Sequence, residues 1–454
     1  MNAQEKIRNL KNKIQKSEVA LKTIKNSSWL IGDKVFTMII GVFITAMVAR
    51  YFGPESYGQF NFSLSIATLF TAFSTLGLET LTVKAIVDKD QDEGVILCTS
   101  LVLRIVGGII LTFLAVLLIR LIEPNDSNTH VLVLILSVTM VFKALEVIEY
   151  WIEAHQRAKI SSIVRILAYV LIAGFKIGMV MFGGTLIHFA LIHVLNVIII
   201  GIGLTIVYFR NRVEKFVWKV DFSYAKSMLS QSWPIILSGL MITLYMQIDK
   251  VMLGSLMSTK VEVGVYSAAV SIASMWYFIP MAIITSFKPV ILSKKKANEE
   301  SYLKSVQLLY IIIAWLGISF GVLVLIFSSP LINILYGAEY QKASNILSIS
   351  IWAGTFAMLG SATSIWLIAE NLQKYKTIFV FGGALVNVVL NYFLIPITGA
   401  YGAAIATLAS QFFANIIVPM FFKELRINSI MIYRSFTFFI TIEAFHRLRE
   451  FLQE

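Results

Sequence analysis

The sequence is poor in cysteine, histidine and charge. It has one cysteine and five histidines in 454 residues. A single cysteine excludes a disulfide within the chain, and the position of Cys98 in an apolar run argues against a thiolate metal site. Charged residues make up 14% of the chain and hydrophobic residues 57%. An ordinary soluble domain has about a quarter of its residues charged, so this composition predicts a membrane protein.

The motifs of common catalytic sites are also missing. The phosphate loop G-x-x-x-x-G-K-[ST], the nucleophile elbow G-x-S-x-G and the zinc motif H-E-x-x-H do not occur. The longest internal loop that we expect, near 210–232, holds about two dozen residues, too few for a catalytic domain. We therefore expect no ATP hydrolysis, no enzyme activity, no cofactor and no metal site.

Apolar stretches of 18 or more residues recur along the whole chain. Each is long enough to cross a hydrocarbon core of about 30 Å, and they predict an all-α polytopic membrane protein with twelve transmembrane helices. The expected spans are 28–50, 57–80, 95–119, 131–150, 163–183, 186–209, 233–255, 264–292, 306–328, 346–369, 377–397 and 402–422.

The basic residues lie almost entirely on one side of these spans. With the N-terminus inside, the cytoplasmic segments hold 28 Lys/Arg and the external segments four. This bias predicts that both termini are cytoplasmic, with anionic phospholipid headgroups rather than nucleic acid as the surface partner. Residues 1–27 are expected to form a basic interfacial helix. Residues 423–454 are expected to be a cytoplasmic tail in which 436–445 lie on the membrane surface.

A weak internal repeat relates two segments about 205 residues apart. The second span begins "YGQFNFSLSI" and the eighth begins "VGVYSAAVSI", which match at Gly58/Gly264, Phe60/Tyr266 and Ser65/Ser271. Six spans separate the copies, so both have the same orientation in the membrane. This predicts two parallel six-helix lobes, 28–209 and 233–422, joined by a cytoplasmic linker at 210–232 and enclosing a central cavity.

Polar residues form faces inside several spans. The second span carries Asn61, Ser65, Thr68, Thr75 and Glu79 at helical spacing, and the eighth carries a similar stripe that ends at Lys288. Further candidates are Asp33 in the first span and Asn387 and Asn391 in the eleventh. Ser and Thr also join helices to one another, but a stripe that runs the full span and recurs in the second half indicates a wet cavity.

Six cations fall inside the predicted spans: Lys34, Arg104, Lys143, Lys176, Lys250 and Lys288. Exposing all of them to lipid would cost on the order of 15 to 20 kcal/mol, so they must snorkel or face inward. Lys34 and Lys288 lie near cytoplasmic ends and Lys143 has Glu146 at i+3.

Arg104 and Lys176 are different, because each lies roughly 14 to 20 Å from the cytoplasmic end of its span. Arg165 shares a helix face with Lys176. We expect these three side chains to face a cavity that binds an anionic solute.

Asp249 and Lys250 lie side by side in "LYMQIDKVMLG" but point about 100° apart in a helix. Asp249 shares its direction with Tyr245, which predicts a cavity face. Lys250 points with Gly254, where small residues indicate a close neighbouring helix.

Several motifs together resemble the O-antigen and exopolysaccharide repeat-unit flippases of the multidrug/oligosaccharidyl-lipid/polysaccharide exporter superfamily. They are "SGLMITLYMQIDKVMLG", "VGVYSAAVSIASMWYFIPMAI", "VARYFGPESYGQFNFSLSI", "LYGAEYQKASNIL" and "NYFLIPITGAYGAAIATLAS", and the resemblance covers about residues 28–422. It implies two lobes of helices in a bacterial cytoplasmic membrane. It also implies transport of undecaprenyl-diphosphate-linked oligosaccharide to the outer leaflet, with other polysaccharide assembly proteins such as a polymerase as partners. Asp249 is the clearest match to the charged lumen residues of this family.

Two other functions remain open on the sequence. A cation-coupled drug or metabolite exporter of the same superfamily would need carboxylates and aromatic walls, and a prenyl-linked sugar transferase would need catalytic groups. Coupling to H⁺, to Na⁺ or to the membrane potential also stays open. Moving an anion out of a negative interior is downhill by about 2.3 kcal/mol per charge per 100 mV.

Overall fold

A computed structural model describes residues 3–211 and 218–437, and within them the chain is helical with no strand. Its long helices are α1 (Ala3–Ser74), α2 (Leu78–Asp88), α3 (Glu93–Ile122), α4 (Ser127–Phe142), α5 (Val147–Ala154), α6 (Ala158–Met181), α7 (Leu186–Asn211), α8 (Phe222–Leu256), α9 (Val261–Met275), α10 (Phe278–Ala297), α11 (Glu299–Tyr336), α12 (Ala343–Ala369), α13 (Lys374–Thr398), α14 (Ala400–Phe412) and α16 (Arg426–Ser435). Short turns of helix complete the chain: η1 (Lys143–Glu146), η2 (Ala338–Tyr340), η3 (Phe413–Ile417), α15 (Val418–Met420) and η4 (Lys423–Leu425).

Eleven helices within the described residues are long and apolar enough to cross a membrane, judged by length and composition. The first, Gly32–Asp88, has 57 residues and holds two of the predicted spans. These two spans are separated at Gly53, whose φ of 69° breaks the helical backbone of α1 just before Pro54. Glycine adopts this left-handed conformation without steric cost. All twelve predicted spans therefore correspond to helical segments.

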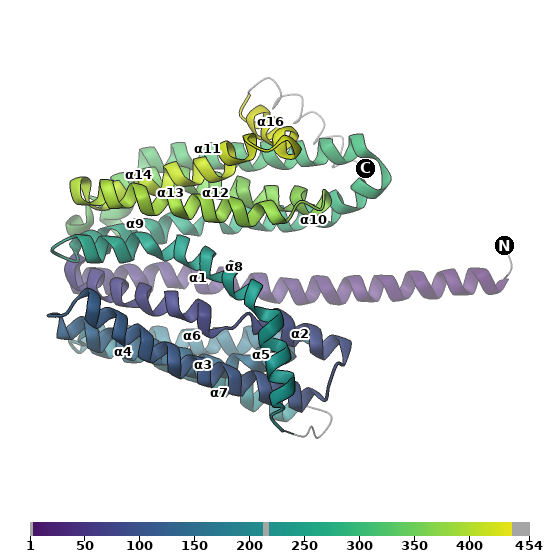
Figure 1. The fold of residues 1–454 in the computed structure, drawn as a ribbon, viewed down its shortest axis with the longest axis horizontal. Coiled ribbons are helices and arrows are strands. Elements are labelled where there is room, and N and C mark those ends of the chain that lie inside the picture. The colour runs from purple at the N-terminus through teal and green to yellow at the C-terminus, as the bar shows by residue number, and fades with distance from the viewer. Residues whose placement is uncertain (1–2, 212–217, 438–454) are drawn as a thin grey trace. The chain divides into compact units, whose positions relative to one another are not determined.

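Contacts divide the chain into two compact units. Unit 1 comprises Met1–Thr45 and Ala67–Gly239, and unit 2 comprises Ala46–Ile66 and Leu240–Glu454. In unit 1, α3 packs on α4, and α7 packs on both α4 and α6, as Figure 1 shows. The unit has a buried cluster around Trp151, Tyr208 and Leu204.

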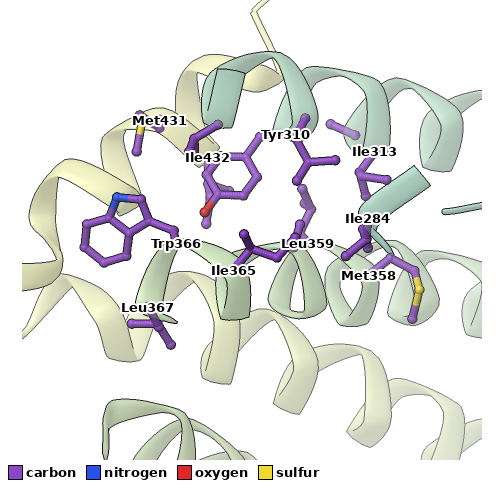
Figure 2. Packing of buried hydrophobic residues seen from close by; sticks show 14 of the residues in the cluster. Ile284, Tyr310, Ile313, Met358, Leu359, Ile365, Trp366, Leu367, Met431 and Ile432 are labelled. Atoms are coloured by element: carbon purple, nitrogen blue, oxygen red, sulfur yellow. The ribbon is translucent and has the colours of Figure 1, made fainter. Parts of the chain in front are cut away.

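Unit 2 is built around α12, which packs against α9, α10, α11 and α14. Its core contains Tyr310 on α11, Leu359 and Trp366 on α12, and Met431 and Ile432 on α16 (Figure 2). Hydrogen bonds hold α16 in place: Tyr310 Oη donates to Asn428 Oδ1 at 2.5 Å and Gln307 Nε2 to the Met431 carbonyl at 3.0 Å. Part of the predicted tail is thus a helix docked on unit 2.

One boundary of the predicted lobes differs from these units, because Ala46–Ile66 pack with unit 2. The cause is a close crossing of α1 and α9 at the glycines that the repeat matches. A Cβ at Gly58 would lie 1.8 Å from the Lys260 carbonyl oxygen, and one at Gly264 would lie 2.0 Å from that of Pro54. Lys260 lies four residues before Gly264, and Pro54 lies four residues before Gly58, so the two contacts are reciprocal. This reciprocity supports the internal repeat.

Gly264→Val is expected to destabilise unit 2, because the added side chain meets backbone rather than a movable side chain. Overpacking of this kind costs about 1 to 3 kcal/mol or more. Thermal unfolding of the purified protein should show a clearly lowered midpoint. Gly174→Ala is the control, since no atom lies within 4 Å of a Cβ built there. An unchanged midpoint for Gly264→Val would contradict the close crossing.

The segments outside the predicted spans are more helical than expected. α8 begins at Phe222, so the second half of the predicted linker at 210–232 is helix. The expected N-terminal helix is present and runs into the first span without a break before Gly53. Its interfacial position stays a prediction. Most of the segment 436–445 lies outside the described residues.

Candidate functional site

Asp249 lies at the centre of a buried polar cluster in unit 2. Its side chain is on α8 and the residue is 4% exposed. Oδ1 accepts a hydrogen bond from Asn391 Nδ2 at 2.7 Å. Oδ2 accepts from Tyr266 Oη and from Thr407 Oγ1, each at 2.5 Å. The cluster joins four helices, because these partners lie on α13, α9 and α14.

The two predicted asparagines complete the cluster. Asn387 and Asn391 are one turn apart on α13 and both are 0% exposed. Asn391 Nδ2 also donates to Asn387 Oδ1 at 3.1 Å, and Asn387 Nδ2 donates to Thr407 Oγ1 at 3.3 Å. The cluster therefore supplies hydrogen-bond donors to both oxygens of Asp249. Asn391 Oδ1 is buried and has no hydrogen-bond partner among the described residues.

The Asp249 cluster forms part of the wall of a cavity of ≈ 340 Å³ inside unit 2. Tyr245 also lines this cavity, as predicted, and its hydroxyl bonds Ser410 Oγ at 2.8 Å. The remaining lining residues come from α8, α9, α12, α13, α14, η3 and the turn between α9 and α10, and include Tyr277, Lys376, Phe379, Gln411 and Asn415. A mostly apolar pocket with a few convergent polar groups is typical of small-ligand sites.

The chemistry of this cluster suits a proton or a monovalent cation more than a transition metal. One carboxylate, two amide oxygens and a hydroxyl are hard oxygen donors. No group of three or more His, Cys, Asp or Glu that could hold a metal ion lies within residues 3–211 and 218–437.

The sequence analysis expected Arg104 to face a cavity that binds an anion. In the structure Arg104 forms a buried ion pair. It is 0% exposed in unit 1. Its Nη1 donates to Tyr150 Oη at 2.6 Å and its Nη2 to Glu146 Oε2 at 3.2 Å. Glu146 follows Lys143 by three residues in the 3₁₀ turn η1, but its carboxylate bonds Arg104.

Arg165 is likewise paired, with Glu149 of α5. Asp33 interacts electrostatically with Arg165, is 6% exposed, and leaves Oδ1 without a hydrogen bond. Glu79 interacts with Glu149. Carboxylates therefore outnumber guanidinium groups here, and both Arg104 and Arg165 have carboxylate partners; that they face a cavity that binds an anion stays a prediction.

That Lys176 faces a cavity that binds an anionic solute stays a prediction. It is half-buried on α6 and has no hydrogen bond or ion pair within the described part of the chain. Lys176 and Lys143 both act electrostatically on His193 of α7, so the three side chains lie in one region of unit 1. No carboxylate is bonded to this lysine pair, Lys143 and Lys176, within residues 3–211 and 218–437.

The other predicted site residues are not brought together. Asn61 donates to the Tyr57 carbonyl of its own helix at 2.9 Å. Glu79 is exposed on α2, because the backbone turns at Leu76 and Gly77 and ends the polar stripe of α1. Lys288 is exposed on α10, and the stripe before it is broken between α9 and α10. Gly254 does contact a neighbouring helix, as expected, since a Cβ there would meet the Phe62 ring of α1 at 2.1 Å.

Sequence reasoning missed Tyr266, Thr407 and Lys376. Thr407 lies within the quoted motif "NYFLIPITGAYGAAIATLAS" and Tyr266 within the repeat, so each was available as a polar position in an apolar span. Their convergence on Asp249 depends on tertiary packing, which helical periodicity does not report.

Comparison with known proteins places this architecture in a family. The model of the polysaccharide biosynthesis protein family matches residues 23–293, and the MatE family model matches residues 234–393. The first match covers more than half of the chain, so the chain belongs to the polysaccharide biosynthesis protein family.

Two curated relatives come from Haloferax volcanii. The probable low-salt glycan biosynthesis flippase Agl15 is 24% identical over 221 residues, 46% of this chain and 44% of that protein. The probable flippase AglR is 26% identical over 176 residues, 38% of this chain and 37% of that protein. The chain thus spans less than half the length of each of these relatives.

Solved structures share the fold. The lipid II flippase MurJ, in an inward closed conformation, superposes with a TM-score of 0.66 at 18% identity, covering 91% of this chain and 96% of that one. An inward-facing multidrug resistance MATE family transporter of the MOP superfamily gives 0.67 at 14% identity, covering 88% and 96%. The chain thus shares its fold with a flippase and with a multidrug transporter, and its eleven apolar helices within the described residues agree with a multi-pass membrane protein.

Proposed function

We propose that this chain flips a lipid-linked oligosaccharide across the membrane in which it is embedded. The observation that carries the proposal is the polysaccharide biosynthesis family match over residues 23–293. The names of both curated relatives, which are called probable flippases, support it. The helical units and their buried polar groups within apolar spans supply the structural means, because polar groups inside a membrane mark transport paths.

The finer form of the proposal follows the sequence. The cargo is an undecaprenyl-diphosphate-linked repeat unit that moves by alternating access from the cytoplasmic to the outer leaflet of a bacterial cytoplasmic membrane. Both termini are cytoplasmic, since 28 of the Lys/Arg residues lie on that side. The product feeds O-antigen, capsule or exopolysaccharide assembly, with a polymerase and anionic phospholipids as partners.

In this proposal the diphosphate is held by the lysine pair of unit 1. Arg104 and Arg165 are already bonded to Glu146 and Glu149 and have little charge to offer. Lys143 and Lys176 have no such carboxylate partner in the part of the chain that the structure describes. Burying two like charges is costly unless an anion joins them, and a diphosphate brings more than one negative charge.

Lys176→Ala is expected to reduce flippase activity about tenfold or more, because a hydrogen bond to a charged group contributes about 1.5 to 3 kcal/mol. The test is deletion of the gene, measurement of lipid-linked sugar units retained on the inner leaflet, and rescue with each variant. Lys159→Ala is the matched control, since Lys159 is exposed on the same helix. Full rescue by Lys176→Ala would contradict a role for the lysine pair.

The driving force is a separate question within this proposal. The Asp249 cluster has the oxygen groups to carry H⁺ or Na⁺, whereas export of an anion is also favoured by the membrane potential. Collapsing the potential at fixed ion gradients in vesicles separates the two. Unchanged flipping would exclude the potential and leave the ion.

A cation-coupled drug or metabolite exporter is the second candidate. The MatE family match, the excess of carboxylates in unit 1 and the aromatic wall near Asp249 favour it. Against it, the polysaccharide biosynthesis family model matches residues 23–293, a longer part of the chain than the MatE match over residues 234–393. Uptake of a fluorescent organic cation into vesicles, with no flipping of lipid-linked sugar, would establish this alternative.

A further inference from the structure

The cavity of unit 2 has two chemically different ends. The Asp249 cluster lies at one end, where Asn387 and Asn391 of α13 contribute to it. Lys376 lies eleven residues before Asn387 on the same helix, which is about 16 Å along the axis. A ligand at the Lys376 end would therefore not touch Asp249.

Lys376 has unused hydrogen-bonding capacity. Its Nζ donates to the Gly360 carbonyl at 3.0 Å and has no carboxylate partner within the described residues. An ammonium group has three donors, so two remain. The Asn415 side chain also packs against Gly360, since a Cβ built at Gly360 would lie 1.9 Å from Asn415 Oδ1. Because Gly360 has no side chain, Lys376 and Asn415 can both lie at this end of the cavity.

A second free polar group at this end is also a donor. Gln411 Nε2 belongs to the cavity lining and has no acceptor among the described residues. The Tyr277 hydroxyl, also in the lining, acts electrostatically on Tyr245 and Tyr266 and so lies toward the Asp249 cluster. The Gln411 carbonyl oxygen Oε1 is taken by Asn415 Nδ2 at 3.0 Å. Phe379 and Tyr245 supply flat apolar walls. The available groups therefore fit a small ligand with acceptor oxygens, a negative charge and an apolar face.

We propose that the Lys376 end of this cavity binds one carboxylated sugar residue. Its carboxylate bonds Lys376, a hydroxyl bonds Gln411, and its ring packs on Phe379. The volume of ≈ 340 Å³ is at the lower end of the range for ligand sites, which suits a single sugar and not a whole repeat unit. The inference rests on the proposed function in one respect, namely that the sugar belongs to the glycan cargo.

Binding of radiolabelled glucuronate to the purified full chain, measured by equilibrium dialysis, tests this site. Glucose and acetate are the comparison ligands. We expect glucuronate to bind about tenfold or more tightly than either, because only it offers both the charge and the ring. Equal binding of glucose would overturn the role of the charge, and equal binding of acetate would overturn the role of the sugar.

Lys376→Gln is expected to weaken glucuronate binding about tenfold or more, and Lys374→Gln to leave it unchanged. Lys374 is the matched control because it is exposed two residues away. Ala357→Phe, at a lining position, fills the cavity without changing charge and should also abolish binding. Undiminished binding by either Lys376→Gln or Ala357→Phe would place the ligand elsewhere and overturn the proposal.

A flipping assay with a lipid-linked neutral glycan distinguishes failure of this inference from failure of the proposed function. If glucuronate does not bind but the neutral glycan is flipped, only the sugar-acid site is wrong. If no glycan is flipped at all, the proposed function itself is wrong.

Discussion

Glu146→Leu should destabilise unit 1 more than Arg104→Met does. Removing Glu146 leaves the guanidinium of Arg104, whose side chain is 1% exposed, as a buried charge whose remaining hydrogen bond among the described residues is to Tyr150. Breaking a buried ion pair in this way costs about 3 to 5 kcal/mol. Removing Arg104 costs less, because the side chain of Glu146 is 34% exposed and retains some solvation.

Thermal unfolding of the purified variants measures this asymmetry. The double variant Arg104→Met/Glu146→Leu is the control, since it removes both charges and should recover part of the stability lost by Glu146→Leu. The opposite order of the single variants, or a double variant less stable than either, would contradict the buried ion pair.

The second large effect is expected for Asp249→Asn, which should reduce transport to about a tenth or less of the natural level. The carboxylate accepts three hydrogen bonds from three helices. An asparagine has one acceptor oxygen and turns an NH₂ group toward donors. Hydrogen bonds to a charged group contribute about 1.5 to 3 kcal/mol each, so the arrangement of α8, α9, α13 and α14 in the transport cycle would change.

Lys250→Gln is the matched control for Asp249→Asn. It removes the neighbouring charge of α8, which lies outside the Asp249 cluster, and we expect near-natural transport. Both variants are first compared by thermal unfolding, so that a loss of folded protein is not taken for a loss of transport. Natural transport by Asp249→Asn would remove this cluster from the mechanism.

The helices could be predicted from the sequence because a membrane span is recognised from its local composition alone. Each needs a long apolar run, and such a run is read directly from composition. The break at Gly53 was anticipated as the gap between the first two predicted spans. Glu79 was assigned to the polar face of the second span because helical periodicity continues to it in the sequence. In the structure the non-glycine residue Leu76, which has a positive φ, lies in the break between α1 and α2.

The candidate site could be predicted only in part, for a physical reason. Asp249, Asn387 and Asn391 were found because an ionisable or amide group in an apolar span needs a partner. The identity of the partner depends on which helices pack together. Arg104 was assigned to a cavity because its charge was visible in the sequence, whereas its pairing with Glu146 and Tyr150 depends on the packing of α3 against η1 and α5.

Reconstitution of the purified chain in vesicles tests the central claim most directly. A fluorescent undecaprenyl-diphosphate oligosaccharide is placed in both leaflets, and a membrane-impermeant quencher reports how much of it reaches the outer one. The account predicts protein-dependent movement beyond the outer-leaflet fraction, reduced in Lys176→Ala and unaffected in Lys159→Ala. Equal quenching with and without the protein, while the same vesicles take up an organic cation, would contradict it.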